Sequence, residues 1–413
     1  MKKILAFVLC AILVCAMVPF SVSAAEGATV VYLKDGAAGD GSSAENAVGD
    51  LQSAYNALDL TKDCTIVVCG PFSQNANFDY AVPFTGSVTF TSVYGGVDYR
   101  ATAAAEYIIT GGFRFFMTGA TTFENLNIHL NKAFWFVIAQ CYPVTFGEGV
   151  ATAFDGDTTG LNFAKAISIL GGYQATDGMS VADETKDINI TVLGGERFAI
   201  GAYNRQADAR NHSGKANITV GGTAKVGCLY FSSVNKPNVS CGDVEITVKD
   251  DANVQYILGT PGAETGVTVN SLTVNWLGGN IENVSSKDAI LPGLTFTTPN
   301  TVTCVNGATL KYAPAVKTNQ YFEIASLGFD KVEEITETPV VTEPVVTTEA
   351  VVTTEATVTT EATVTTEATV DTTVAPVDPE PTPSTGDASV MIAVAAAAVI
   401  SVAAVVLLKK KEN

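Results

Sequence analysis

Basic residues are scarce in this sequence, with 23 Lys and Arg against 42 Asp and Glu and a formal net charge of −19 at pH 7. Such a chain is repelled by the phosphate backbone, so nucleic acid is not an expected partner. Histidine occurs only twice, and nucleophile-elbow, P-loop and zinc signatures are lacking. The sequence therefore assigns no catalytic residue.

The cysteines also lack the spacing of a metal site. Six of them follow residue 25, without CxxC or CxxxH spacing. Cys64 and Cys69 are five residues apart and would face opposite sides of one strand, so a disulfide within that strand is not expected. We interpret the cysteines as small apolar core residues. No metal ligand and no cofactor is assigned; a structural calcium ion is an option that the sequence does not indicate.

Long apolar runs are confined to the two ends. Residues 1–24 combine two early lysines, an apolar run and small residues at the end, which is typical of a secretory signal peptide. Residues 388–408 contain no charge and precede the basic tail 409–413, which predicts one transmembrane helix with a cytoplasmic tail. We therefore expect residues 25–330 to form an ectodomain at the extracellular face of the cell surface, anchored in the membrane or cell wall.

Residues 331–387 form a low-complexity Thr/Val/Glu/Pro segment with a six-residue repeat that ends in Thr-Thr-Glu-Ala. A six-residue period gives no core-forming helix face, and like charges favour extension. In a polyproline-like geometry of ~3.1 Å per residue, about 54 residues reach on the order of 170 Å. We expect a disordered stalk.

The ectodomain is rich in Val, Thr, Ile, Asn and Gly and has one short helical pattern, at residues 51–58, which predicts an all-β domain. Four runs recur with a constant 28-residue period, each followed by a Gly or Asp turn: Ile188–Val192, Ala216–Val220, Val244–Val248 and Leu272–Trp276. Because such a unit cannot bury its own inner face, we expect the units to stack as the coils of a parallel β-solenoid.

An aromatic pair suggests earlier coils and a binding surface. Residues 113–115 and 134–136 are both Phe-X-Phe and have a 21-residue spacing, so we expect the phenylalanines to stack inward. Arg114 and Trp135 would then lie side by side on the outside, as a glycan-binding patch. The alternative is that this pair packs under a loop, or lines the core with the register reversed.

Residues 31–41, the pattern at 51–58 and the apolar run 65–68 resemble the opening of right-handed parallel β-helix proteins of the pectate-lyase-like class. The resemblance covers most of residues 29–310, and implies a strand, a Gly/Asp turn and a short helix that caps the first coil. Lyases, hydrolases and adhesins share these motifs, so the resemblance does not supply a function.

The segment Thr-Pro-Ser-Thr-Gly before the last apolar run is similar to the sorting signal of sortase-anchored wall proteins. The similarity implies that Pro383, Thr385 and Gly386 belong to such a signal, with cleavage after Thr385. It also implies sortase and peptidoglycan as partners. The usual first Leu is Thr382 here. The alternative is a plain membrane anchor.

Few residues are candidates for catalysis. Asp250 and Asp251 occupy a turn position that Gly-Gly fills in sister repeats, and Asp155 and Asp157 lie in a Gly/Thr-rich loop, which favours turns or a weak cation site. Asp243 is a further candidate. The histidines, His129 and His212, are interpreted as structural or solvated.

We therefore expect a non-enzymatic display or adhesin-like protein that binds glycans or neighbouring cells. The alternative is a polysaccharide lyase or glycoside hydrolase on the same fold. A charged cluster in a groove of one sheet would favour the enzyme. A smooth Thr/Asn/Val face would favour display.

Overall fold

The computed structural model describes residues 27–132, 134–156, 165–174, 184–205, 211–234, 237–260, 265–284 and 302–336. All of them belong to the first of two compact units, Met1–Val341 and Thr342–Asn413. The predicted signal peptide, transmembrane helix, basic tail and sorting residues lie outside the described residues. Within the described ranges, no helix has the length and apolar composition needed to cross a bilayer.

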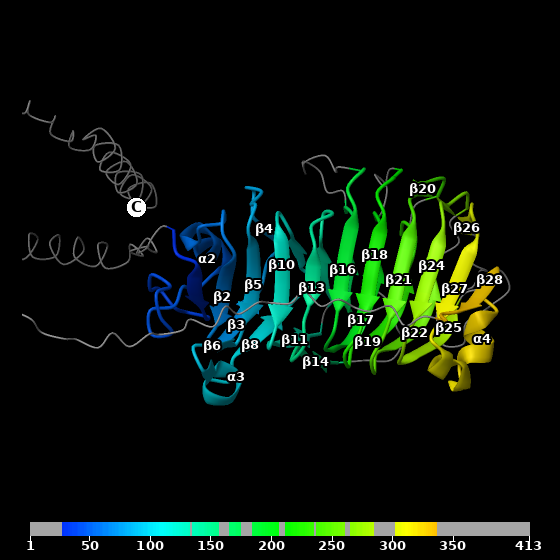
Figure 1. The fold of residues 1–413 in the computed structure, drawn as a ribbon. Coiled ribbons are helices and arrows are strands. Elements are labelled where there is room, and N and C mark those ends of the chain that lie inside the picture. Colours follow the sequence, from blue (N-terminus) through cyan, green and yellow to red (C-terminus); the bar gives the residue numbers. More distant parts are fainter. Residues whose placement is uncertain are drawn as a thin grey trace, which may run out of the picture. The chain divides into compact units, whose positions relative to one another are not determined.

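The largest sheet has eleven strands, which lie side by side in the order of the chain (Figure 1). In spatial order its strands are β1 (Val30–Leu33), β2 (Cys64–Val68), β5 (Ser87–Thr91), β10 (Ala120–Glu124), β13 (Val144–Phe146), β16 (Ile188–Val192), β18 (Ala216–Val220), β21 (Val244–Val248), β24 (Leu272–Trp276), β27 (Ala308–Tyr312) and β28 (Lys331–Glu334). Every neighbouring pair in it is parallel.

Most of the strands that lie between those of the largest sheet along the chain belong to three smaller parallel sheets. An eight-stranded sheet contains β25 (Asn280–Val284), β22 (Asn253–Leu258), β19 (Lys225–Tyr230), β17 (Glu196–Gly201), β15 (Ile167–Leu170), β12 (Trp135–Ile138), β9 (Arg114–Phe116) and β4 (Phe78–Asp79). A four-stranded sheet contains β14 (Ala151–Asp155), β11 (Asn127–Asn131), β8 (Glu106–Ile109) and β3 (Pro71–Gln74), and a three-stranded sheet contains β20 (Ser240–Cys241), β23 (Thr268–Val269) and β26 (Thr303–Cys304). The short pair β6 (Val93–Tyr94) and β7 (Val97–Asp98) is antiparallel.

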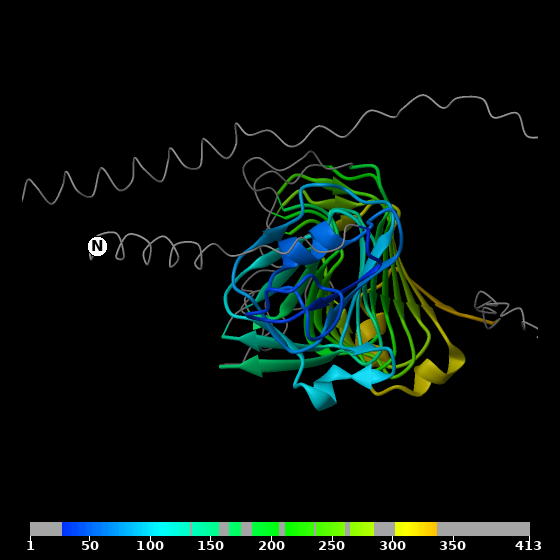
Figure 2. The same cartoon turned by 90° about the vertical axis from the view of Figure 1, so that its left-hand side faces the viewer.

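The 28-residue repeat is the stacking register of the coils. Ile188 pairs with Ala216, Ala216 with Val244 and Val244 with Leu272. Figure 2 looks along the stack from its N-terminal end and shows the sheets around one interior. The predicted all-β, mostly parallel architecture is therefore confirmed, with strands stacked coil by coil as in a β-solenoid.

Alternation along each strand divides core from surface. In β18, Ala216, Ile218 and Val220 are buried, while Asn217 and Thr219 between them are partly exposed. Because the coils stack in register, the same positions are buried or exposed in the next coil. Aromatic rings form one such inner column in the N-terminal half, where Phe123 lies 5.1 Å from Phe90 and 4.9 Å from Phe146 between ring centroids.

The turns after these strands need left-handed backbone. Gly222 has a φ of +54°, and a Cβ there would lie 2.2 Å from the Leu193 carbonyl oxygen. One coil later Asp250 has a φ of +57°, which an aspartate tolerates, and its Oδ2 accepts a hydrogen bond of 3.0 Å from the Gly222 amide. The interpretation of Asp250 as a turn residue is confirmed.

Both ends of the stack are covered. The predicted helix is α2 (Leu51–Ala57), whose Asp50 cap accepts a hydrogen bond from the Ser53 amide and whose apolar side packs on β1. At the other end α4 (Phe322–Ser326) puts Phe322 4.8 Å from the Tyr312 ring. Two further short helices are α3 (Tyr99–Thr102) and η2 (Pro314–Thr318).

The last strand corrects a predicted boundary. β28 pairs with β27 and consists of residues that the sequence assigned to the stalk, so the folded part continues past residue 330. Its charged side chains, with Lys331 bonded to Glu333, discourage another chain from pairing with this edge.

Candidate functional site

The predicted patch of Arg114 and Trp135 does not form. Arg114 pairs with Phe136 and not with Trp135, so this coil is one residue longer than the Phe-X-Phe spacing suggested. Trp135 is fully buried and packs on Phe123 at 5.4 Å, which closes its ring to any sugar. Trp135 instead lines the core with the register reversed, as in the alternative prediction. Phe136 lies in a second apolar cluster, with the Arg205 guanidinium 4.7 Å from its ring.

The outer face of the eleven-stranded sheet carries a row that we call the threonine column. It consists of one threonine from each of seven successive strands, all in register: Thr65, Thr89, Thr122, Thr145, Thr191, Thr219 and Thr247. All seven are partly exposed. Neighbouring strands lie about 4.7–4.9 Å apart, so the hydroxyls repeat at that spacing over on the order of 30 Å. The column is an extended, regular and uncharged surface.

Polar residues form a second row beside the threonine column, two residues before its threonines on β16, β18 and β21. Asn217 donates to Asn189 at 3.1 Å on the adjacent strand, and Glu245 takes the next position. The Glu245 carboxylate accepts from Lys215 at 2.5 Å and from Asn275 at 2.8 Å. The hydrogen bond from Lys215 lowers the pKa of Glu245. The charge of Glu245 is therefore compensated within the sheet face.

A second group lies on the four-stranded sheet. His129 on β11 reaches both neighbouring strands, with Nδ1 3.3 Å from Glu106 and Nε2 3.2 Å from Asp155. Burial lowers the pKa of His129, but hydrogen bonds to Asp155 and Glu106 outweigh this and raise it overall. The interpretation of His129 as structural agrees with these bonds, since it ties three coils together. Asp155 is the last residue of strand β14 and does not lie in the predicted loop, since β14 pairs with β11, whereas Asp157 lies outside the described residues.

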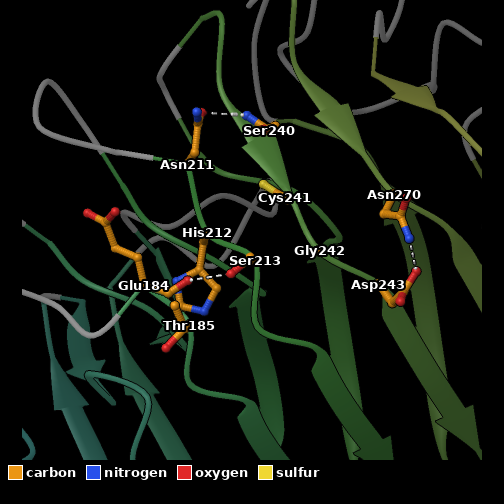
Figure 3. A pocket seen from close by; sticks show the side chains of 10 residues that line it. All are labelled: Glu184, Thr185, Asn211, His212, Ser213, Ser240, Cys241, Gly242, Asp243 and Asn270. Atoms are coloured by element: carbon orange, nitrogen blue, oxygen red, sulfur yellow. Dashed lines mark hydrogen bonds between the residues drawn. The ribbon is translucent and has the colours of Figure 1, made fainter.

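A pocket of about 380 Å³ lies where four successive coils turn into the large sheet (Figure 3). Its walls come from the segments just before β16, β18, β21 and β24, and include Asn211, His212, Asp243 and Asn270. Asn211 accepts from the Ser240 amide at 3.0 Å. Amides, hydroxyls and carboxylates thus line a concave site whose described residues include no lysine or arginine.

Buried groups fix the backbone of this pocket. Tyr203 donates to the carbonyl oxygens of Gly214 and Asp243 at 3.1 and 2.9 Å. His212 is buried, lies 5.2 Å from the Tyr203 ring and donates from Nε2 to the Lys186 carbonyl at 2.8 Å. The structural interpretation of His212 agrees with this bond, although the residue also reaches the pocket wall.

Cys241 pairs with His212 across adjacent coils, which raises the question of thiol chemistry. Burial raises the pKa of Cys241 to about 11, so its thiol stays protonated at neutral pH. Within the described residues none of the six cysteines forms a disulfide, and five of them are buried. This confirms the interpretation of cysteines as core residues for these five, whereas Cys304 is partly exposed and packs against the core. The protonated thiol of Cys241 favours binding over nucleophilic chemistry in the pocket.

Known site signatures give no further guidance. Comparisons with models of protein families, with curated proteins and with solved structures found no match. In the described part of the chain, no group of three or more His, Cys, Asp or Glu side chains could hold a metal ion. The structure places the sequence candidate Asp243 in the lining of this pocket, but the pocket itself was missed from the sequence, where the only other signal is the polar composition of the segments before each 28-residue repeat.

Proposed function

We propose that this protein is a non-enzymatic, adhesin-like surface protein whose solenoid binds an extended, neutral glycan along the threonine column. The threonine column is the observation that carries the proposal. Its seven hydroxyls repeat in register with the coils, so a chain of regularly repeated sugars can bond to several of them at once.

The chemistry of threonine supports this ligand class. A β-branched side chain has few χ1 rotamers, so ordering it on binding costs little entropy. Each residue offers a hydroxyl that donates and accepts, and a methyl group that packs against the apolar side of a sugar ring. No charged residue interrupts the seven positions, which disfavours acidic polysaccharides.

Display at the cell surface is part of the same proposal. The signal peptide, the stalk and the apolar C-terminal run predicted from the sequence would export the solenoid and hold it away from the membrane. We keep sortase and peptidoglycan as proposed partners, with a membrane anchor as the alternative. The mass of the mature C-terminus distinguishes them, since sorting ends the chain at Thr385.

The pectate-lyase-like resemblance remains a proposal about fold class. The order of β1, α2 and β2 supports it, because strand, turn, helix and strand follow each other as that class implies. A lyase or hydrolase remains the alternative function, for which the threonine column supplies no acid or base.

The test is retention of the full-length chain, in a detergent without a sugar headgroup, on insoluble neutral and acidic polysaccharides. We expect retention on a neutral polysaccharide, and a loss of at least about tenfold in Thr219→Lys, because a bulky charge then interrupts the column. Thr318→Lys is the matched control, since Thr318 is exposed on η2 away from the sheet, and it should bind like the unchanged protein.

Two results would count against the proposal. Equal retention of Thr219→Lys and the unchanged protein would remove the threonine column from binding. Release of reducing or unsaturated ends from any of the polysaccharides would replace display by the enzymatic alternative.

A further inference from the structure

The pocket at the coil corners is separate from the threonine column and has a different shape. The column is open and extended, whereas the pocket is concave and about 380 Å³ in volume, near the lower end of small-ligand sites. A chain passing along the sheet needs no such cavity. A single sugar ring fits into a cavity of this size.

The polar groups of the pocket are held in place before any ligand arrives. Asp243 Oδ1 accepts from Asn270 at 2.7 Å and from Ser271 at 2.5 Å, and Asn270 Oδ1 accepts from Asn306 at 2.9 Å. Within the described residues both hydrogen bonds to the Asp243 carboxylate use Oδ1, and a carboxylate has the capacity to accept further bonds from a ligand. Tyr203 fixes the Asp243 backbone from the interior side. This pre-organisation lowers the entropic cost of binding.

The charge of the lining selects the class of ligand. Carboxylates accept hydrogen bonds from hydroxyls more strongly than neutral groups do, and Asp243 and the side chains of Asn211 and Asn270 together suit a polyhydroxylated ring. In the described lining, which contains no lysine or arginine, the Asp243 carboxylate would repel a uronate or phosphate. An apolar ligand would cover the amides and carboxylates without offering them any further hydrogen bond.

We infer that this pocket is a binding site for one neutral sugar unit, with Asp243 and Asn270 as its hydrogen-bonding residues. The inference rests on the proposed function only in taking a glycan as the ligand class. It adds a second site, which recognises a single ring or chain end, to the extended surface of the threonine column.

A close structural relative of Asp243 offers a matched control. Asp187 precedes β16 as Asp243 precedes β21, and its Oδ1 accepts from the Lys215 amide at 2.8 Å, but it is not part of the pocket lining. Asp187→Asn and Asp243→Asn therefore make the same chemical change at equivalent coil positions. Only Asp243→Asn alters a residue of the pocket lining, so a loss of sugar binding confined to this variant would indicate a contact with the ligand.

The experiment titrates glucose, galactose, mannose and N-acetylglucosamine, with glucuronate as the acidic comparison, into the full-length chain and follows binding by saturation-transfer NMR. We expect at least one neutral sugar to bind with a Kd on the order of 1 mM, tighter than glucuronate. Asp243→Asn should weaken it about tenfold, because a charge-assisted hydrogen bond is lost, while Asp187→Asn leaves it unchanged.

The inference is overturned if none of the neutral sugars binds, if glucuronate binds more tightly, or if the two aspartate variants behave alike. Its failure is distinguishable from that of the proposed function. Retention on polysaccharide that depends on Thr219 tests the threonine column alone, and monosaccharide binding that depends on Asp243 tests the pocket alone.

Discussion

Phe123 is the residue whose replacement tests the coil stacking most directly. Its ring lies between Phe90 and Phe146 at 5.1 and 4.9 Å, and Trp135 and Phe115 meet it edge-on at 5.4 and 5.9 Å. Truncating a buried Phe to Ala costs about 3–5 kcal/mol, and each lost aromatic pair adds about 0.5–1.5 kcal/mol. Because these contributions overlap, we expect Phe123→Ala to lower the free energy of unfolding by about 5 kcal/mol.

The two tryptophans of the chain make the effect measurable in separate parts of the stack. Trp135 contacts Phe123, whereas Trp276 lies in β24 near the C-terminal cap. In a solenoid each coil contacts only its neighbours, so the damage should stay local. In urea, fluorescence of a Trp276→Phe background should report a midpoint for Trp135 that falls by about 2 M in Phe123→Ala. A Trp135→Phe background should report a smaller fall for Trp276.

Leu327→Ala is the control, because Leu327 is 76% exposed and its loss should change stability by less than about 0.5 kcal/mol. If both tryptophan signals fell together by the same amount, the solenoid would unfold as one unit and the nearest-neighbour reasoning would be wrong. If neither moved, the aromatic column itself would be in doubt.

Two further predictions concern titrating groups. Since the folded pKa of His129 is raised, its contribution to stability is complete below the unfolded value of about 6.5 and is lost as the pH rises through the folded pKa. The urea midpoint of the unchanged protein should therefore exceed that of His129→Gln by more at pH 5.5 than at pH 8.5, and an equal difference at both would contradict the link to Glu106 and Asp155. Burial raises the pKa of Cys228 to about 12, so iodoacetamide at pH 8 should label this thiol only after unfolding, as peptide mass mapping with and without urea would reveal.

Much of the fold could be predicted because local pattern and long-range register agree in the central coils. From Ile188 to Trp276 the apolar positions alternate and recur with the 28-residue period, so a coil placed on the next one buries the same positions. The turn at Asp250 followed from the same alignment, since Gly222 fills its place one coil earlier. The short helix α2 was visible from its apolar spacing.

The N-terminal coils could not be predicted so well, because their lengths differ. When a coil is longer by a single residue, the parity of the next strand changes, and with it the face that every side chain takes. Phe115 and Trp135 both point inward, although the Phe-X-Phe pattern suggested that Phe115 and Phe136 would. Because neighbouring residues here are apolar, the local pattern does not distinguish the inward from the outward face. Only packing between coils decides which side chains point inward.

In the central coils the sequence by itself determined the strands, the turns and the regular 28-residue stacking, because these follow from alternation and glycine position within a few residues of chain. Only the tertiary structure decided which side chains meet across coils of unequal length. It brought His129 between Glu106 and Asp155, and it closed the pocket of Asp243 and Asn270 from the corners of four coils. Such sites depend on the distance between strands that are neighbours in space but a whole coil apart in sequence, which no local pattern encodes.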